Sequence, residues 1–167
     1  TDGSISCWGD ATDGRTTPPV GSNFVSISAG YDHTCALDTS GSVSCWGSYS
    51  DTSSETFDML VSGHQYNCGL DEHDVVRCWG ENEYGQAQPR HYNYLEIGVG
   101  TDHSCARTEF DSIHCWGNTS SLQGTSPAGF YSKLSVGVQH NCAIRDGGAI
   151  YCWGDGTYGQ VFPPTTS

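Results

Sequence analysis

Short runs rich in β-branched and aromatic residues recur along the chain, and residues that favour turns bound each run. Ser42–Trp46 and Ala149–Trp153 show the pattern clearly, and this composition and length are typical of β-strands. Turn-forming segments precede them, at 38–41 and 145–148. No amphipathic helix of three turns or more is apparent in the sequence. The pattern therefore predicts an all-β protein made of short strands joined by turns.

A tripeptide, Cys-Trp-Gly, marks an internal repeat. It occurs five times, at steps of 38, 33, 37 and 37 residues, and contains all five tryptophans of the chain. The motif cysteines are Cys7, Cys45, Cys78, Cys115 and Cys152. Each of the other four lies ten positions before a motif cysteine: Cys35, Cys68, Cys105 and Cys142. Such regular spacing predicts one structural unit for each repeat.

Other positions repeat in register with the cysteines. An aromatic residue, an aliphatic residue and a glycine precede each cysteine pair, and a histidine or tyrosine stands two positions before its first cysteine. The copies are Phe24, Ile27, Gly30 and His33; Phe57, Leu60, Gly63 and Tyr66; Tyr94, Ile97, Gly100 and His103; Tyr131, Leu134, Gly137 and His140. Tyr-Gly-Gln follows the tripeptide in two copies, at 84–86 and 158–160.

The repeat divides the chain into a half unit and four complete units. We place the half unit at 1–22 and the complete units at 23–56, 57–92, 93–129 and 130–167. A period of 33 to 38 residues with strand and turn content is typical of β-propeller blades. We expect a single propeller-like domain of about five short blades, one of them half built, or a segment of a larger propeller. Its open strand edges favour pairing with another chain.

The cysteine spacing predicts hairpin disulfides. Ten residues across a turn place both cysteines of a unit opposite each other, within reach of disulfide geometry. We expect the bridges Cys35–Cys45, Cys68–Cys78, Cys105–Cys115 and Cys142–Cys152, each contributing about 2–3 kcal/mol. The alternative, a zinc site, lacks the Cys-x-x-Cys spacing that such sites favour. Cys7 is either a thiol whose upstream partner is missing or an intermolecular bridge.

Composition and charge narrow the function classes. The 167 residues include 19 acidic and 6 basic side chains, which gives a formal net charge of −13. A surface this acidic repels phosphate backbones, so we expect no nucleic-acid partner. No apolar run approaches the roughly 18 residues that span a bilayer, so we expect no membrane insertion. Nine regularly spaced cysteines indicate an oxidising compartment, and we expect a secreted, extracellular or cell-surface protein.

Two repeated side chains have both an architectural and a functional interpretation. The tryptophans could stack on sugar rings, but a residue repeated once per unit more often packs between blades. His33, His103 and His140 could gather around an axis and bind a metal. Tyr66 takes the fourth position and is a poor zinc ligand, so we expect core side chains that hydrogen-bond backbone groups. We therefore expect no metal and no cofactor.

Three segments resemble a known repeat. Gly30–Leu37, Gly41–Gly47 and residues 79–86 match the repeat of the regulator of chromosome condensation superfamily, and the resemblance extends over nearly the whole chain. It implies a β-propeller in which each repeat supplies one blade. The intracellular founders of that superfamily lack the paired cysteines, have longer blades and close a ring of seven. The shorter, cysteine-bearing form is similar to the extracellular repeats of crinkly-type plant receptor kinases, so chromatin binding and nucleotide exchange are not expected.

These features together predict a non-enzymatic extracellular module, because no motif for a nucleophile or a phosphate site is recognisable. We expect it to bind protein partners, or copies of itself, through loops and open blade edges. The alternative is a lectin-like propeller with one shallow glycan site per blade. Its candidate glycan contacts are Tyr31, Tyr84, Tyr92 and Tyr158. Asn118-Thr119-Ser120 is a sequon in a predicted surface loop, so Asn118 is a candidate glycosylation site.

Overall fold

The computed structural model describes residues 2–163, and these residues form an all-β array. Within them, twelve strands make four three-stranded antiparallel sheets, and the helical content is a single 3-10 turn, η1 (Thr12–Gly14). Blade 1 consists of β1 (Phe24–Ala29), β2 (His33–Asp38) and β3 (Val43–Gly47). Blade 2 consists of β4 (Met59–Ser62), β5 (Tyr66–Leu70) and β6 (Val76–Gly80). Blade 3 is β7 (Tyr94–Val99), β8 (His103–Thr108) and β9 (Ile113–Gly117), and blade 4 is β10 (Tyr131–Val136), β11 (His140–Arg145) and β12 (Ile150–Gly154).

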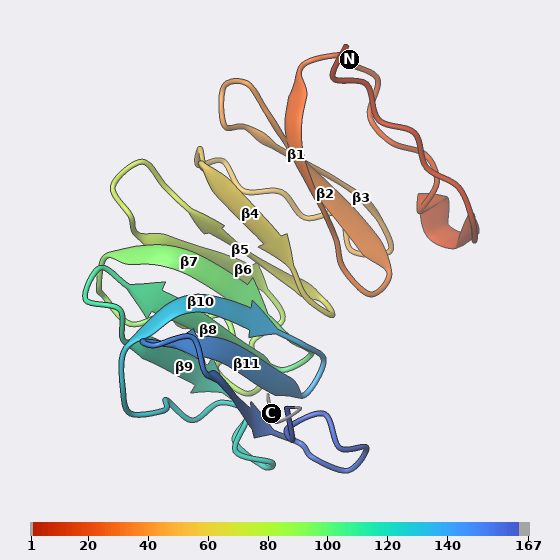
Figure 1. Ribbon diagram of the computed structural model, residues 1–167. Coiled ribbons are helices and arrows are strands. Elements are labelled where there is room, and N and C mark those ends of the chain that lie inside the picture. The colour runs from red at the N-terminus through yellow and green to blue at the C-terminus, as the bar shows by residue number, and fades with distance from the viewer. Residues whose placement is uncertain (1, 164–167) are drawn as a thin grey trace.

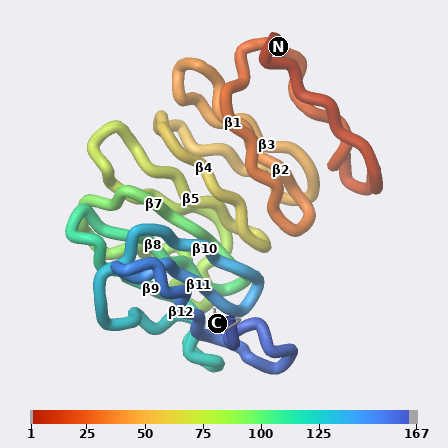
Figure 2. The backbone as a smooth tube through the Cα atoms, in the orientation of Figure 1, coloured from red at the N-terminus to blue at the C-terminus, as the bar shows by residue number. Residues whose placement is uncertain are grey.

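The four sheets follow one another in chain order, like the blades of a propeller (Figure 1). In each sheet the second strand lies between the first and the third. Adjacent blades contact each other through their first strands: β1 with β4, β4 with β7, and β7 with β10. Figure 2 traces this path as a tube, with the N-terminal segment and blade 4 at opposite ends of the array. The described residues therefore form an open arc.

A disulfide joins the last two strands of every blade. Cys35 stands opposite Cys45 in the antiparallel register of β2 and β3, and the other three blades repeat this register. The four bridges expected from the ten-residue spacing are present, with S–S distances of 2.06–2.10 Å. Each blade is thus a disulfide-linked hairpin of its second and third strands, with the first strand paired to the other edge of the second.

A glycine after the first strand of each blade allows the next blade to approach closely. A Cβ on Gly30 would come within 2.5 Å of the carbonyl oxygen of Gly63 in blade 2. Gly63 has the same relation to Gly100, at 2.8 Å, and Gly100 to Gly137, at 2.7 Å. Because any side chain here would push the blades apart, the repeat requires glycine at this position.

The apolar core lies at the boundaries between blades. At each boundary between two complete blades, the aliphatic residue of the first strand packs in one cluster with a cysteine of the preceding blade. The pairs are Leu60 with Cys35, Ile97 with Cys68, and Leu134 with Cys105. A blade therefore needs a neighbour to bury its apolar surface, as is typical of repeat proteins.

The predicted all-β, propeller-like fold is confirmed. The strands predicted at 42–46 and 149–153 are found one residue later, as β3 and β12. Four blades are complete, and the half unit contains no assigned strand among its described residues. Every sheet lies inside one predicted unit, while the unit boundaries themselves stay predictions. Residue 1 of the half unit and residues 164–167 of the last unit lie outside the described residues.

Candidate interaction surface

A hydrogen bond between side chains links adjacent blades. His33 Nε2 lies 2.8 Å from Asn67 Oδ1 of blade 2, and His103 Nε2 lies 2.9 Å from Asn141 Oδ1 of blade 4. All four side chains are buried. Because an amide oxygen only accepts, Nε2–H of each histidine must donate. The bond therefore fixes the tautomer of the histidine and the relative position of two blades.

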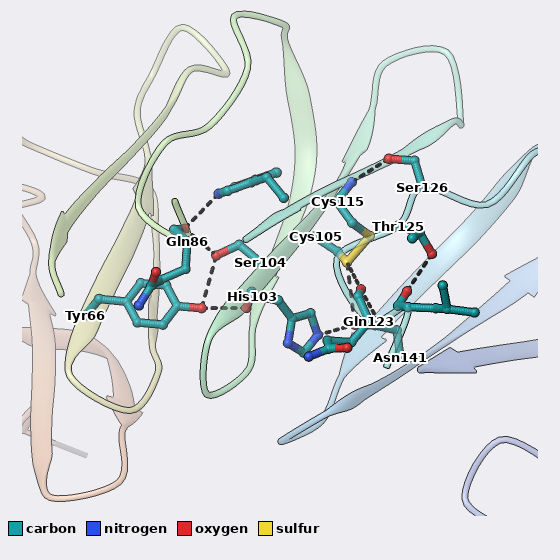
Figure 3. Close-up of a disulfide and its surroundings, with 12 residues drawn as sticks. Tyr66, Gln86, His103, Ser104, Cys105, Cys115, Gln123, Thr125, Ser126 and Asn141 are labelled. Carbon is teal, nitrogen blue, oxygen red and sulfur yellow. Dashed lines mark hydrogen bonds between the residues drawn. A yellow bond between two sulfur atoms is a disulfide. The ribbon is translucent and has the colours of Figure 1, made fainter. Parts of the chain in front are cut away.

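Blade 2 makes the same link with a tyrosine (Figure 3). The hydroxyl of Tyr66 donates to the backbone oxygen of His103, 2.5 Å away, and lies 3.1 Å from Ser104 Oγ. Burial raises the pKa of Tyr66 above its usual value and lowers the pKa of His103, so both side chains are held neutral. The expectation of a backbone partner is met by Tyr66. It is wrong for the two histidines, because the polar group that the next blade presents to them is an asparagine side chain.

The motif tryptophans of blades 1, 2 and 3 join their blade to the connecting loop that precedes it, whereas the indole nitrogen of Trp153 in blade 4 has no hydrogen-bond partner among the described residues. The other three indole N–H groups donate to backbone oxygens of that loop at 2.7–3.0 Å. The pairs are Trp46 with Arg15, Trp79 with Asp51, and Trp116 with Gln86. Two of the rings also pack on the leading aromatic residue of their own blade: Trp79 on Phe57, with 5.5 Å between ring centroids, and Trp116 on Tyr94, with 6.2 Å. These contacts support the architectural interpretation of the motif tryptophans.

A glutamine organises the loop that follows a blade. In the turns at 84–86 and 158–160, its Oε1 accepts the N–H of the residue two positions earlier, at 2.8 Å in both. The turn at 121–123 makes the same bond at 2.8 Å and is therefore a third copy of the motif. The Tyr-Gly-Gln motif does not reveal this copy in the sequence, because the segment 121–123 has only the glutamine in common with it. Its middle residue, Leu122, has φ of 64°, where Gly85 has 80°.

At each end of the array, one side chain of the inter-blade hydrogen bond has no partner among residues 2–163. Thr34 of blade 1 stands where Asn67 and Asn141 accept a hydrogen bond in later blades. His140 of blade 4 stands where His103 donates one in blade 3. Neither Thr34 nor His140 makes a side-chain hydrogen bond within residues 2–163. The end faces thus present groups that are paired at internal boundaries.

A groove of about 300 Å³ separates the half unit from blade 1. Cys7 and Trp8 line one side, and Ile27 and Thr34 line the other. Cys7 is a half-buried free cysteine, with no disulfide partner among the described residues. Trp8 is 88% exposed, whereas Trp116 in blade 3 is 7% exposed. The groove therefore exposes side chains whose counterparts are buried elsewhere in the array.

A second cavity, of about 540 Å³, lies where the first strands of the four blades end. The glycines that allow close blade contact line it, together with Tyr31 and His64, whose ring centroids are 4.7 Å apart. Most of the remaining lining residues are alanine and valine. This cavity belongs to the centre of the array and brings together no set of acids, bases and nucleophiles within the described residues.

The four tyrosines proposed as glycan contacts are accessible but lie apart. Each is at least 48% exposed. Tyr31 lines both cavities, and Tyr84 and Tyr158 lie in equivalent turns after blades 2 and 4. Tyr92 packs against His114, with 4.5 Å between ring centroids. The structure does not gather these tyrosines into one site, and a separate glycan site on each blade stays a prediction.

The remaining candidate residues lie on the surface. Asn118 is in the turn after β9, where its Oδ1 accepts the N–H of Ser120 at 2.9 Å, and its glycosylation stays a prediction. Residues 2–163 contain no group of three or more metal-binding side chains. In the same part of the chain, no helix has the length and apolar character needed to cross a bilayer.

Two of the four complete units match a known family model. The family model of the regulator of chromosome condensation (RCC1) repeat matches residues 24–51 and 131–160, which include all the strands of blades 1 and 4. Blades 1 and 4 therefore match the RCC1 repeat. Blades 2 and 3 have the same strand order and the same hairpin disulfide. The resemblance inferred from the sequence is therefore confirmed.

Several solved structures resemble most of the chain. The ectodomain of the receptor kinase CR4 from Physcomitrella patens is 27% identical, with a TM-score of 0.78, and the match covers 97% of this chain and 49% of that one. The CRINKLY ectodomain of the Arabidopsis thaliana receptor kinase ACR4 is also 27% identical, with a TM-score of 0.67, over 78% of this chain and 49% of that one. Yeast RCC1 (Prp20), solved with Kap60, has a TM-score of 0.76 at 17% identity, over 90% of this chain and 48% of that one.

These matches differ in what they establish. At 17% identity, yeast RCC1 shows the fold alone, whereas the two receptor ectodomains share more of the sequence. This chain spans about half the length of each of these structures. Among curated proteins, none matches its sequence significantly.

Proposed function

We propose that this chain is an extracellular protein-interaction module, which binds protein partners or copies of itself through its open blade edges and loops. Two matched structures support this role in general, because they are ectodomains of receptor kinases. Four hairpin disulfides are typical of extracellular proteins. No catalytic step is part of the proposal.

The observation that carries the proposal is apolar exposure at both ends of the array. Ile27, at the N-terminal end, is 54% exposed, whereas its counterpart Leu60 in blade 2 is 4% exposed. Ile150, at the other end, is 52% exposed, whereas Ile113 at the same position in blade 3 is 1% exposed. Apolar side chains that internal boundaries bury and the two ends expose are typical of an interaction site.

The test measures binding of the purified chain against a panel of extracellular protein domains, and its self-association by sedimentation. Ile27→Asp and Ile150→Asp place a charge on the two end surfaces. Phe110→Asp, in the exposed turn of blade 3, is the matched control. We expect an end variant to weaken binding at least about tenfold, which corresponds to about 1.4 kcal/mol, while the control binds as the unmodified chain does.

A chain that stays monomeric and binds no member of the panel would contradict the proposal. Equal binding by all three variants would contradict the assignment to the open ends. Self-association has to overcome the repulsion between copies that each carry a net charge of −13, so we expect it to strengthen as salt is added.

A further inference from the structure

The half unit has the backbone arrangement of the third strand of a blade. Burial alternates along it from Gly3 to Trp8, as in a strand. The N–H of Phe24 donates to the backbone oxygen of Gly3 at 3.2 Å. Phe57, Tyr94 and Tyr131, the leading aromatic residues of blades 2 to 4, donate the equivalent bond to the preceding blade. In every case, Gly3 included, the acceptor is the residue four positions before a motif cysteine. Residues 3–9 therefore occupy the place of an outer strand.

Gly9 shows which neighbour this strand would have. Its φ of 110° agrees with the 107° of Gly47 and the 109° of Gly80 in complete blades. A Cβ on Gly47 would lie 2.6 Å from the backbone oxygen of Asp32, beside the second strand. A Cβ on Gly9 would meet no described atom within 4 Å. The half unit thus keeps the backbone shape of a paired strand on an edge that is open.

Blade 1 supplies the other wall of this opening. The first-strand aliphatic residue packs against the disulfide cluster of the preceding blade at every internal boundary, but Ile27 lies exposed in the groove beside Cys7. Thr34, in the same wall, holds the position that receives a histidine or tyrosine from the preceding blade. Both walls of the groove therefore match the surroundings of a second strand.

We propose that this groove is a β-strand docking site, which takes an extended segment of a polypeptide outside these 167 residues and holds it by a disulfide to Cys7. The segment carries histidine or tyrosine, then a small polar residue, cysteine, alanine or glycine, and an apolar residue. This inference rests on the proposed function and names the chemistry of one partner. The continuity of the groove with the repeated blade boundary supports this occupant.

The register of the complete blades specifies how the segment lies. Cys35 stands opposite Cys45, so the incoming cysteine lies opposite Cys7. His33 stands opposite Gly47, so the incoming histidine or tyrosine lies opposite Gly9, within reach of Thr34. Leu37 stands opposite Val43, so the incoming apolar side chain lies opposite Ile5 and helps to cover Ile27. Strand addition of this kind takes affinity from the backbone and specificity from alternate side chains.

A second copy of the chain does not meet these requirements. Eight of its nine cysteines form the hairpin disulfides, which leaves Cys7 itself. Cys7 is preceded by Ile5 and Ser6, and thus lacks the histidine or tyrosine two positions earlier. A bond between two Cys7 residues would join two half units and would supply neither of them with a second strand.

The covalent step is a thiol–disulfide exchange. The Cys7 thiolate attacks the sulfur of a partner cysteine that is held in a mixed disulfide with glutathione. The bond between Cys7 and the partner forms, the bond between the partner and glutathione breaks, and glutathione leaves with the proton as a thiol. The mixed disulfide supplies the oxidising equivalent, so no other oxidant is required.

The test uses a synthetic peptide with the sequence of residues 31–38, Tyr-Asp-His-Thr-Cys-Ala-Leu-Asp, prepared as its glutathione mixed disulfide. A peptide with the same residues in shuffled order, the cysteine kept in place, is the control. Intact mass gives the equilibrium between adduct and free chain, and hydrogen exchange reports the amides of residues 5–9. We expect the ordered peptide to favour the adduct at least about tenfold over the shuffled one, and to protect those amides.

Variants test whether the groove is responsible. Ile27→Asp is expected to remove the preference for the ordered peptide, because it places a charge where the strand would pack. Val20→Asp, at a fully exposed position, is expected to leave the preference unchanged. Equal equilibria for the two peptides would overturn the proposal, and so would dimers linked through Cys7 that form in preference to the adduct. Either result leaves the proposed function standing if binding to a panel member still depends on Ile150.

Discussion

The boundary between blades 3 and 4 and the boundary between the half unit and blade 1 use the same residue positions with opposite results. At the inner boundary, His103 donates to Asn141, and both side chains are buried. At the outer boundary, Thr34 holds the position of Asn141, but its side chain has no hydrogen-bond partner among residues 2–163, and Ile27 is exposed. The repeat sequence alone therefore does not bury its apolar residues, because burial requires a neighbouring blade on each side.

This difference teaches that stability in the array is a property of boundaries. A repeat protein behaves approximately as a sum of unit terms and nearest-neighbour terms. A substitution at an internal boundary removes both kinds of term, whereas the equivalent substitution at an end removes little. Matched pairs of variants at the two kinds of position can therefore separate the energy of the boundary from the energy of the blade.

The largest difference is expected for the motif tryptophans. Trp116→Ala removes a buried indole and its hydrogen bond to the backbone oxygen of Gln86, so we expect a loss of about 3–5 kcal/mol in the free energy of unfolding. Trp8→Ala removes an exposed side chain, and we expect a change within about 0.5 kcal/mol. Urea unfolding of both variants measures the two values. Equal losses would show that the exposed and buried motifs contribute alike, against the boundary account.

The hydrogen-bond link gives the next pair. Asn141→Ala leaves the buried Nε2–H of His103 without an acceptor and removes the bond from Asn141 Nδ2 to the backbone oxygen of Gln123, so we expect a loss of about 2–3 kcal/mol. Thr34→Ala removes a side chain with no hydrogen bond in the described residues, and we expect a change within about 0.5 kcal/mol. The same unfolding measurement applies. A loss from Thr34→Ala as large as that from Asn141→Ala would contradict the role of the link.

Much of the fold was predictable because the regularly spaced cysteine pairs allow few other arrangements of the strands. Each cysteine pair spans ten residues with turn-forming residues between, and this arrangement fits a hairpin whatever the rest of the blade contains. The strands around Cys45 and Cys152 were therefore predicted to within one residue. The resemblance to RCC1 repeats rests on the same positions, and a family model matches two of the four complete units.

The hydrogen bond between blades was not predictable, because the residue at the accepting position differs from repeat to repeat. The residue before the first cysteine is threonine, asparagine, serine and asparagine in successive blades, at Thr34, Asn67, Ser104 and Asn141. Because the residue type varies, a single sequence does not show that these positions share a role. The contact also joins residues 34 to 38 positions apart, which local patterns do not indicate. The candidate tyrosines show the reverse case. They recur in loops of the sequence, but the array holds them apart.

The pH dependence of stability sharpens the comparison at the inner boundary. Burial lowers the pKa of His103 from 6.5 in the folded chain, so the unfolded chain takes up the proton first, and stability falls as the pH drops below about 6.5. Hydrogen bonds from Ser40 and Thr157 lower the pKa values of Asp38 and Asp155, whose contribution is lost only below their usual 3.8. The pH range in which His103 lowers the stability therefore lies above the range in which the carboxylates do so.

We expect His103→Gln to flatten the decline in unfolding free energy between about pH 7.5 and about pH 5, because glutamine keeps a hydrogen-bonding side chain but does not titrate. Urea unfolding at both pH values measures the slope. His91→Gln, at an exposed position, is the matched control and is expected to keep the slope of the unmodified chain. An unchanged slope in His103→Gln would exclude the buried imidazole as its source.

The smallest effect is expected in the loops, where two equivalent turns differ in their middle residue. Leu122 adopts a positive φ of 64° at a position that glycine holds in the turn after blade 2, and its side chain is exposed. The left-handed backbone costs a non-glycine residue about 1–2 kcal/mol, and the extra entropy of unfolded glycine returns part of that cost. We expect Leu122→Gly to stabilise the chain by about 0.5–1 kcal/mol and Gly85→Leu to destabilise it by a similar amount, both measured by urea unfolding. If Leu122→Gly instead lowered stability, the leucine side chain would have to contribute through packing, and the two turns would not be equivalent.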